Sequence, residues 1–218
     1  MIAKYIRCEV PAANRDDFSK GQSLWQATAH CQGFISQLGG WDLSSGKSTS
    51  GKAMILARWS DMESVKNFMR VTHDPIAEET NQDGTYSTIS VSYLRLVMSI
   101  PALNQHQNHH CNSQVGCGFI RIADCYIDPE KANEFIKEQA RLWNPGMQRV
   151  EGMLGGQVWL FNDKPQRYLV TTYWENEAAH RHYASHYFPA LKQQAATDII
   201  QSISGYHIQT EPSWQITP

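Results

Sequence analysis

The sequence has no excess of either charge and no long apolar run, and each absence excludes a class of protein. The 19 Lys and Arg residues nearly balance the 21 Asp and Glu residues, which gives a formal net charge of -2. No basic run suggests a surface for nucleic acid or for anionic lipid. No apolar stretch approaches the roughly 20 residues that span a bilayer. We therefore expect neither a nucleic-acid partner nor a membrane partner.

Cysteine is scarce and irregularly placed. The five cysteines cannot all pair within one chain, and none belongs to a CxxC pair. Reduced thiols are the simplest interpretation, and the charged N-terminus lacks the apolar segment of a signal peptide, so we expect a cytoplasmic location. The motifs GxGxxG, GxSxG and HExxH and the Walker loop are also absent. The residue patterns predict no cofactor and no metal.

The sequence does contain an internal duplication. Landmark residues recur in the same order in both halves, with gaps that differ by three positions at most, and such an order indicates a repeat. The matched pairs are Cys8 and Cys125, Phe18 and Phe135, Gln22 and Gln139, Trp25 and Trp143, Trp41 and Trp159, and Trp59 and Trp174. Each copy is about 100 residues long, which is a normal size for a small domain.

A polar stretch with almost no apolar residues separates the two copies. Its His106, His109, His110 and Cys111 carry enough donor atoms for a transition metal. A flexible linker gives such ligands no rigid support, so we interpret the stretch as a solvated linker and not as a metal site. The predicted division is a first repeat at 1–101, a His-rich linker at 102–116 and a second repeat at 117–218.

Each copy reads as a βαββαβ unit. In the first copy, alternation and turn signals predict strands at 2–10, 34–43, 53–59 and 88–97, with helices after the first and third strands. This order is typical of a ferredoxin-like α+β unit, with four antiparallel strands and both helices on one face. The strands are apolar on both faces, so the bare sheet face must be covered. Two sheets packed face to face would close an α+β barrel within one chain, and further oligomerisation stays open.

A family resemblance rests on a few short segments: Ile6-Arg7-Cys8, Gly33-Phe34, Gly39-Gly40-Trp41, Trp59 and His73-Asp74-Pro75-Ile76. With these segments the chain resembles the dimeric α+β barrel superfamily, which includes antibiotic biosynthesis monooxygenase-like proteins. It is most similar to the two-repeat bacterial YdbC-like proteins. The resemblance implies a cofactor-free monooxygenase-like enzyme that acts on a small aromatic or apolar metabolite. The alternative is a non-catalytic small-molecule-binding protein, or a stress-associated structural protein with no active site.

The predicted site lies at the second helix of the first copy. A carboxylate beside an imidazole can fix its tautomer and support general-base chemistry, so we predict His73 as the base and Asp74 as its orienting group. Asp74 favours the first copy, because Tyr187 follows His186 in the second. The predicted substrate-binding residues are Trp25, Trp59, Phe68, Trp174, Tyr183 and His186. The alternative for the aromatic residues is core packing, and for each His a helix-end contact with backbone or solvent.

Overall fold

The structure is a computed structural model that describes residues 1–45, 50–102, 116–196 and 198–218. Its contacts divide the chain into two compact units, residues 1–95 with 208–218 and residues 96–207. Most of the predicted linker at 102–116 lies outside the described residues, and so do His106, His109, His110 and Cys111. The repeats at 1–101 and 117–218 remain a prediction, and the compact units are divided differently because two strands each contribute to both units.

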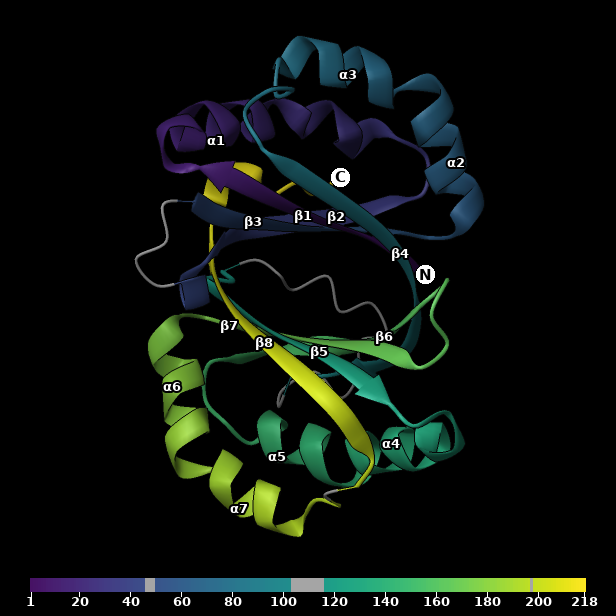
Figure 1. Cartoon of the computed structure of the whole chain (residues 1–218), viewed down its shortest axis with the longest axis vertical. Coiled ribbons are helices and arrows are strands. Elements are labelled where there is room, and N and C mark those ends of the chain that lie inside the picture. The colour runs from purple at the N-terminus through teal and green to yellow at the C-terminus, as the bar shows by residue number, and fades with distance from the viewer. Residues whose placement is uncertain (46–49, 103–115, 197) are drawn as a thin grey trace. The chain divides into compact units, whose positions relative to one another are not determined.

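The first unit follows the predicted βαββαβ order, with its helices on one face of its sheet (Figure 1). The second helical segment is broken in two at Thr72. Pro75 has no N–H to donate to the carbonyl of Val71, and its ring would collide with that carbonyl in a continuous helix, so a new helix begins at His73. The elements are β1 (Ile2–Pro11), α1 (Arg15–Ser23), the 3-10 segment η2 (Leu24–His30), β2 (Phe34–Asp42), β3 (Ser50–Trp59), α2 (Met62–Val71), α3 (His73–Thr80) and β4 (Thr88–Ile100).

The second unit repeats this order, with a short π-helical turn after its first helix. Its second helical segment is again broken, at Tyr187 before Pro189. The elements are β5 (Phe119–Ile127), α4 (Ala132–Glu138), α5 (Asn144–Gln148), β6 (Met153–Phe161), β7 (Arg167–Trp174), α6 (Glu177–His186), α7 (Phe188–Gln194) and β8 (Ile200–Thr210).

All strand pairs are antiparallel, as the sequence predicts. In the first unit β1 lies between β3 and β4, with Tyr5 opposite Leu56 on one side and Ser92 on the other, and β3 also pairs with β2. In the second unit β7 lies between β5 and β6. The hydrogen-bonded strand order β1-β3-β2-β8-β5-β7-β6-β4 closes as a barrel. The predicted α+β fold, a duplicated ferredoxin-like unit that forms a barrel, is therefore confirmed.

The last residues of the chain complete the first unit. The end of β8 pairs with β2, where Gly40 lies opposite Thr210, and a Cβ at Gly40 would overlap the carbonyl oxygen of Gln209. Beyond β8, Ile216 exchanges two backbone hydrogen bonds with Gln37, of 2.8 and 3.0 Å. The C-terminal segment 208–218 is therefore built into the first unit as an added strand end and a following bridge.

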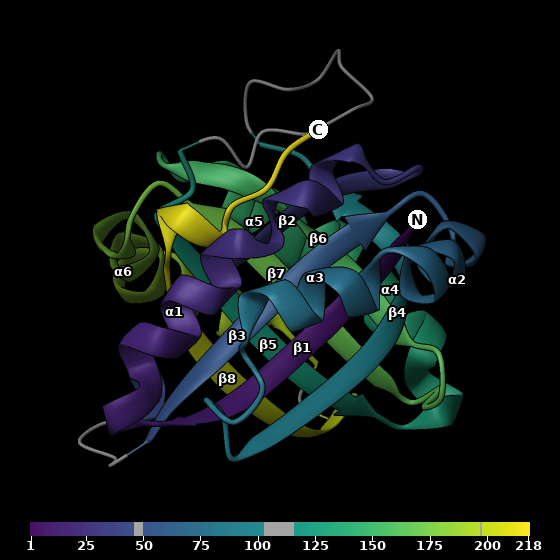
Figure 2. The same ribbon diagram turned by 90° about the horizontal axis from the view of Figure 1, so that it is seen from above.

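Alternation along β1 determines which side chains meet the helices. Ile6 and Cys8 face the helix layer, where Cys8 packs with Phe18 of α1. Tyr5, which precedes Ile6 along β1, faces the other side of the sheet and is buried there, with its hydroxyl 3.4 Å from the Met54 sulfur. Figure 2 shows α1 and α3 lying over β1 and β3. The space between these helices and the sheet holds the candidate site.

Among the described residues, no helix combines the length and the apolar character needed to cross a membrane.

Candidate functional site

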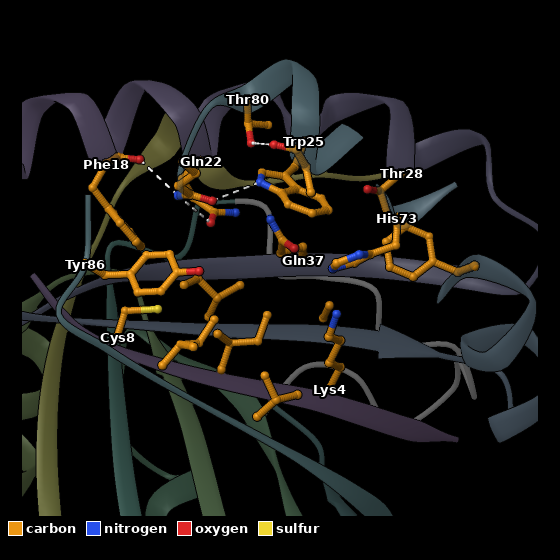
Figure 3. Close-up of a pocket in the computed structure, with 18 of the residues that line it drawn as sticks. Lys4, Cys8, Phe18, Gln22, Trp25, Thr28, Gln37, His73, Thr80 and Tyr86 are labelled. Atoms are coloured by element: carbon orange, nitrogen blue, oxygen red, sulfur yellow. Dashed lines mark hydrogen bonds between the residues drawn. The ribbon is translucent and has the colours of Figure 1, made fainter. Parts of the chain in front are cut away.

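A cavity of about 130 Å³ lies between the helices and the sheet of the first unit. For comparison, an apolar cavity of about 150 Å³ takes up benzene. Strands β1 and β3 supply one wall, and α1, η2 and α3 supply the other (Figure 3). The cavity therefore has room for a molecule with a single aromatic ring.

One end of the cavity is formed by Phe18, Cys8 and Tyr86 (Figure 3). Burial raises the pKa of the Cys8 thiol to about 12. Burial, together with the hydrogen bond from the Tyr86 hydroxyl to Asp83 (2.9 Å), also raises the pKa of Tyr86 to about 12. Both groups are neutral near pH 7, so this end of the cavity contributes packing surface for a ligand but no nucleophile or base.

Hydrogen bonds of the Gln82 side chain hold the helix side of the cavity in place. The Gln82 side chain donates to the Phe18 carbonyl (3.1 Å) and accepts from the indole N–H of Trp25 (3.1 Å). Its amide nitrogen also lies 3.4 Å from the Gln22 side-chain oxygen. The Trp25 indole N–H is therefore already paired, and this ring can offer a ligand its face but not a donor.

The predicted pair His73 and Asp74 lies at the other end. The Nδ1 atom of His73 is 2.8 Å from the Asp74 carboxylate, which is the geometry the sequence predicts. The imidazole is wedged between two rings, 5.3 Å from the Trp25 centroid and 5.7 Å from that of Phe68. Asp74 itself is exposed, whereas His73 is only partly exposed and lines the cavity. The carboxylate thus anchors Nδ1 from the solvent side and leaves Nε2 available for a ligand.

Lys4 is a cavity residue that the sequence interpretation missed. It is 6% exposed, and its ammonium nitrogen lies 3.3 Å from the Met69 sulfur and 5.5 Å from the centre of the Phe68 ring. In the described part of the chain no acidic side chain forms an ion pair with it. Burial lowers its pKa from 10.5 to about 8. The sequence could have identified Lys4, because it points to the same face of β1 as Ile6 and Cys8 and is a charged residue on that otherwise apolar face.

Two polar atoms in the cavity wall have no hydrogen-bond partner among the described residues. They are the Thr28 hydroxyl and the indole N–H of Trp59. Both residues are nearly fully buried, at 2% and 0% exposure, and both line the cavity. A buried polar group without a partner costs about 1–3 kcal/mol, so such pairs of atoms call for a ligand or water.

In the second copy, the matching tryptophan has a hydrogen-bond partner within its own unit. The indole N–H of Trp174 donates to the Thr172 hydroxyl at 3.0 Å. The corresponding residue of the first copy, two positions before Trp59, is Ala57, which has no hydroxyl and lines the cavity. The unpaired N–H is therefore a specific property of the first copy.

The other predicted binding residues divide between the two units. Trp25, Trp59 and Phe68 line the cavity of the first unit together with His73. Trp174 and Tyr183 belong to the core of the second unit, where their rings stack at 5.4 Å and burial raises the pKa of Tyr183. His186 is exposed, with Nδ1 3.1 Å from the His182 carbonyl. The structure thus brings the first-copy residues together, and His186 does not join Trp174 and Tyr183 in their core.

Two family models match the two halves of the chain. A domain of unknown function, DUF4937, matches residues 2–94, and the antibiotic biosynthesis monooxygenase family matches residues 118–194. The uncharacterized protein YdbC of Bacillus subtilis is 39% identical over 92 residues, which are 42% of this chain and 76% of YdbC. The chain belongs to the YdbC-like proteins, and its second half matches the antibiotic biosynthesis monooxygenase family model. The resemblance inferred from the sequence is thereby confirmed.

Solved structures with the same fold cover nearly the whole chain. A proposed monooxygenase of Fusobacterium nucleatum superposes with a TM-score of 0.75 at 12% identity, covering 96% of this chain and 91% of that one. A proposed monooxygenase of Lactobacillus acidophilus gives 0.71 at 13% identity, with 99% and 95% covered. An anthrone oxidase-like protein gives 0.62 at 9% identity, with 96% and 91% covered. At these identities the similarity establishes the fold alone.

Proposed function

We propose that the chain is a cofactor-free monooxygenase-like enzyme that binds a small, single-ring aromatic metabolite in the cavity of its first unit. The observation that carries the proposal is the pair of unpartnered, buried polar atoms, Thr28 Oγ1 and Trp59 Nε1, in a cavity of about 130 Å³. Phe68 and Trp59 supply the flat wall, and the His73–Asp74 pair stands at the opposite end from Tyr86. The similarity to proposed monooxygenases supports the chemical class by analogy only.

His73 serves as the base in this proposal. With Nδ1 held by Asp74, its Nε2 atom can take the proton of a ring hydroxyl and leave an electron-rich phenolate. Dioxygen is the oxidant: a phenol gains one oxygen atom to become a quinone, and the second oxygen atom leaves as water with the two hydrogens that the phenol loses. The protein contributes orientation, deprotonation and exclusion of bulk water.

Removal of the base tests the catalytic part of the proposal. We expect His73→Ala to abolish oxygen consumption in a panel of single-ring phenols while changing the free energy of unfolding by about 1 kcal/mol, because the side chain is partly exposed but packs between two aromatic rings. Asp74→Asn, which keeps a hydrogen-bonding group but loses the charge, should retain an intermediate rate. His186→Ala in the second copy is the matched control and should behave as wild type.

Aerobic and anaerobic incubations separate the two functions that the sequence left open. Oxygen-dependent quinone formation that needs His73 supports the enzyme. Saturable phenol binding without any oxygen use would instead support a small-molecule-binding protein. Absence of binding to the first unit would contradict both.

The difference between the two copies at Ala57 provides a sharper test of binding. We expect Ala57→Thr to weaken phenol binding at least about tenfold, because the new hydroxyl fills the cavity and pairs with the Trp59 N–H as Thr172 pairs with Trp174. Calorimetric titration measures the loss, and Ala57→Val is the matched control that adds the same volume without the hydroxyl. Wild-type affinity in Ala57→Thr would show that the ligand does not use this wall.

A further inference from the structure

The Lys4 amine is the reactive group that the proposed base chemistry does not use. It rises from β1 into the cavity, on the side that His73 and Gln37 occupy (Figure 3). The Lys4 amine contacts the Met69 sulfur and the face of the Phe68 ring. No acidic side chain of the described residues forms an ion pair with it. Burying a charged amine without an ionic partner costs folding free energy, and a chemical role for the amine would explain why a lysine stands at this position.

We propose that Lys4 is a covalent binding site for carbonyl compounds, and that it forms an imine with a single-ring aromatic aldehyde or ketone held in the cavity. This inference rests on the proposed function only in that both place an aromatic ligand in the same cavity. It assigns to the site a different ligand class, in which a carbonyl carbon and not a ring hydroxyl meets the protein.

The environment of Lys4 fits an amine nucleophile. A lysine desolvated in an apolar pocket is the usual form of an imine-forming amine, because the neutral base and not the ammonium attacks a carbonyl carbon. Burial lowers the Lys4 pKa to about 8, so the neutral fraction of the amine, which is small at pH 7, grows steeply as the pH rises towards 8. The surrounding wall includes the apolar side chains of Ile6, Ala57 and Phe68, which solvate a charged amine poorly.

The polar atoms of the cavity suit the intermediate. Attack of Lys4 Nζ on the carbonyl carbon forms a C–N bond and turns the carbonyl oxygen into a hydroxyl. That oxygen then leaves as water with both amine hydrogens, and a C=N bond remains, with no change in oxidation state. The unpartnered Trp59 N–H and Thr28 hydroxyl can hold the oxygen as charge develops on it, and His73 can supply the proton that makes it a leaving group.

The test is reductive trapping on the full-length chain. Benzaldehyde is added with sodium cyanoborohydride, which reduces the imine to a stable benzylamine, and intact mass followed by peptide mapping locates the adduct. We expect a single rapid adduct on Lys4, with a rate that increases as the pH is raised towards 8, and none at this position in Lys4→Met. Lys4→Arg keeps the charge but cannot form an imine and should also remain unmodified there. Lys52→Met, which removes an exposed lysine of β3, should trap at the wild-type rate.

Benzyl alcohol, which has the same ring but no carbonyl, separates this inference from the proposed function. It should bind the wild-type cavity and slow trapping at Lys4 in proportion to its occupancy. Slow modification spread over surface lysines, equal in wild type and Lys4→Met, would overturn the imine site. If benzyl alcohol still binds in that case, only the imine is lost. If neither compound reaches the cavity, the proposed function fails with it.

Discussion

Replacing Trp214 by alanine is expected to destabilise the first unit by about 3–5 kcal/mol, although the residue stands four positions from the end of the chain. Its side chain is fully buried, with ring centroids 5.6 Å from Phe18 and 5.2 Å from Trp41. Its indole N–H donates to the Ser19 backbone and hydroxyl oxygens at 3.2 and 3.1 Å. Truncation therefore leaves a large void and removes both hydrogen bonds to helix α1.

Urea denaturation measures this effect, with tryptophan fluorescence and the circular dichroism of the helices as independent probes. Ile203→Ala is the matched control, because Ile203 is an apolar residue of β8 that is 57% exposed. It should change the free energy of unfolding by no more than about 0.5 kcal/mol. A loss below about 1 kcal/mol in Trp214→Ala would mean that the C-terminal segment is not part of the core of the first unit.

Lys4→Met is expected to stabilise the protein at pH 7, by about 3 kcal/mol. Burial lowers the Lys4 pKa from 10.5 to about 8, and each unit corresponds to about 1.4 kcal/mol. At pH 7 the amine is charged in both states, so the folded state bears the full desolvation cost. Between pH 8 and 10.5 the folded amine is neutral while the unfolded one still holds its proton, so the stability of the wild type rises with pH.

The difference between Lys4→Met and wild type should therefore shrink as the pH is raised from 8 towards 10.5. Urea denaturation at a series of pH values measures it, and Lys52→Met, whose side chain is 41% exposed, should show no such trend. A Lys4→Met variant less stable than wild type at pH 7 would show that the ammonium has a stabilising partner. Higher stability of Lys4→Met at pH 7 would mean that Lys4 serves function at a cost in folding stability.

The sequence predicted the fold well because its signals are local and repeated. Alternation along β1 and the matched tryptophans each indicate the place of one element, and the duplication gives each signal twice. The helix break before His73 was not anticipated, although Pro75 is its cause. The partner of the C-terminal segment was not anticipated either, because nothing in the residues around Trp214 says which part of the chain they pack against.

Part of the candidate site could be predicted from the sequence. His73 and Asp74 are adjacent in sequence, so their contact needed no tertiary information, and Trp59 was marked by the repeat. Lys4 could have been recognised as a charge on an apolar strand face. The unpaired N–H of Trp59 could not, because it depends on which side chains surround a buried ring and on comparison of Ala57 with Thr172 in the folded copies.

We propose that the Trp59 N–H faces a ligand site, whereas the Trp174 N–H is satisfied within its own unit. The direct measurement is the indole N–H region of the ¹H–¹⁵N spectrum, assigned with Trp59→Phe and Trp174→Phe, during a titration with phenol. We predict that the Trp59 resonance shifts to saturation and that the Trp174 resonance stays in place. A Trp59 resonance unmoved at saturating phenol, or a shift confined to Trp174, would contradict the claim.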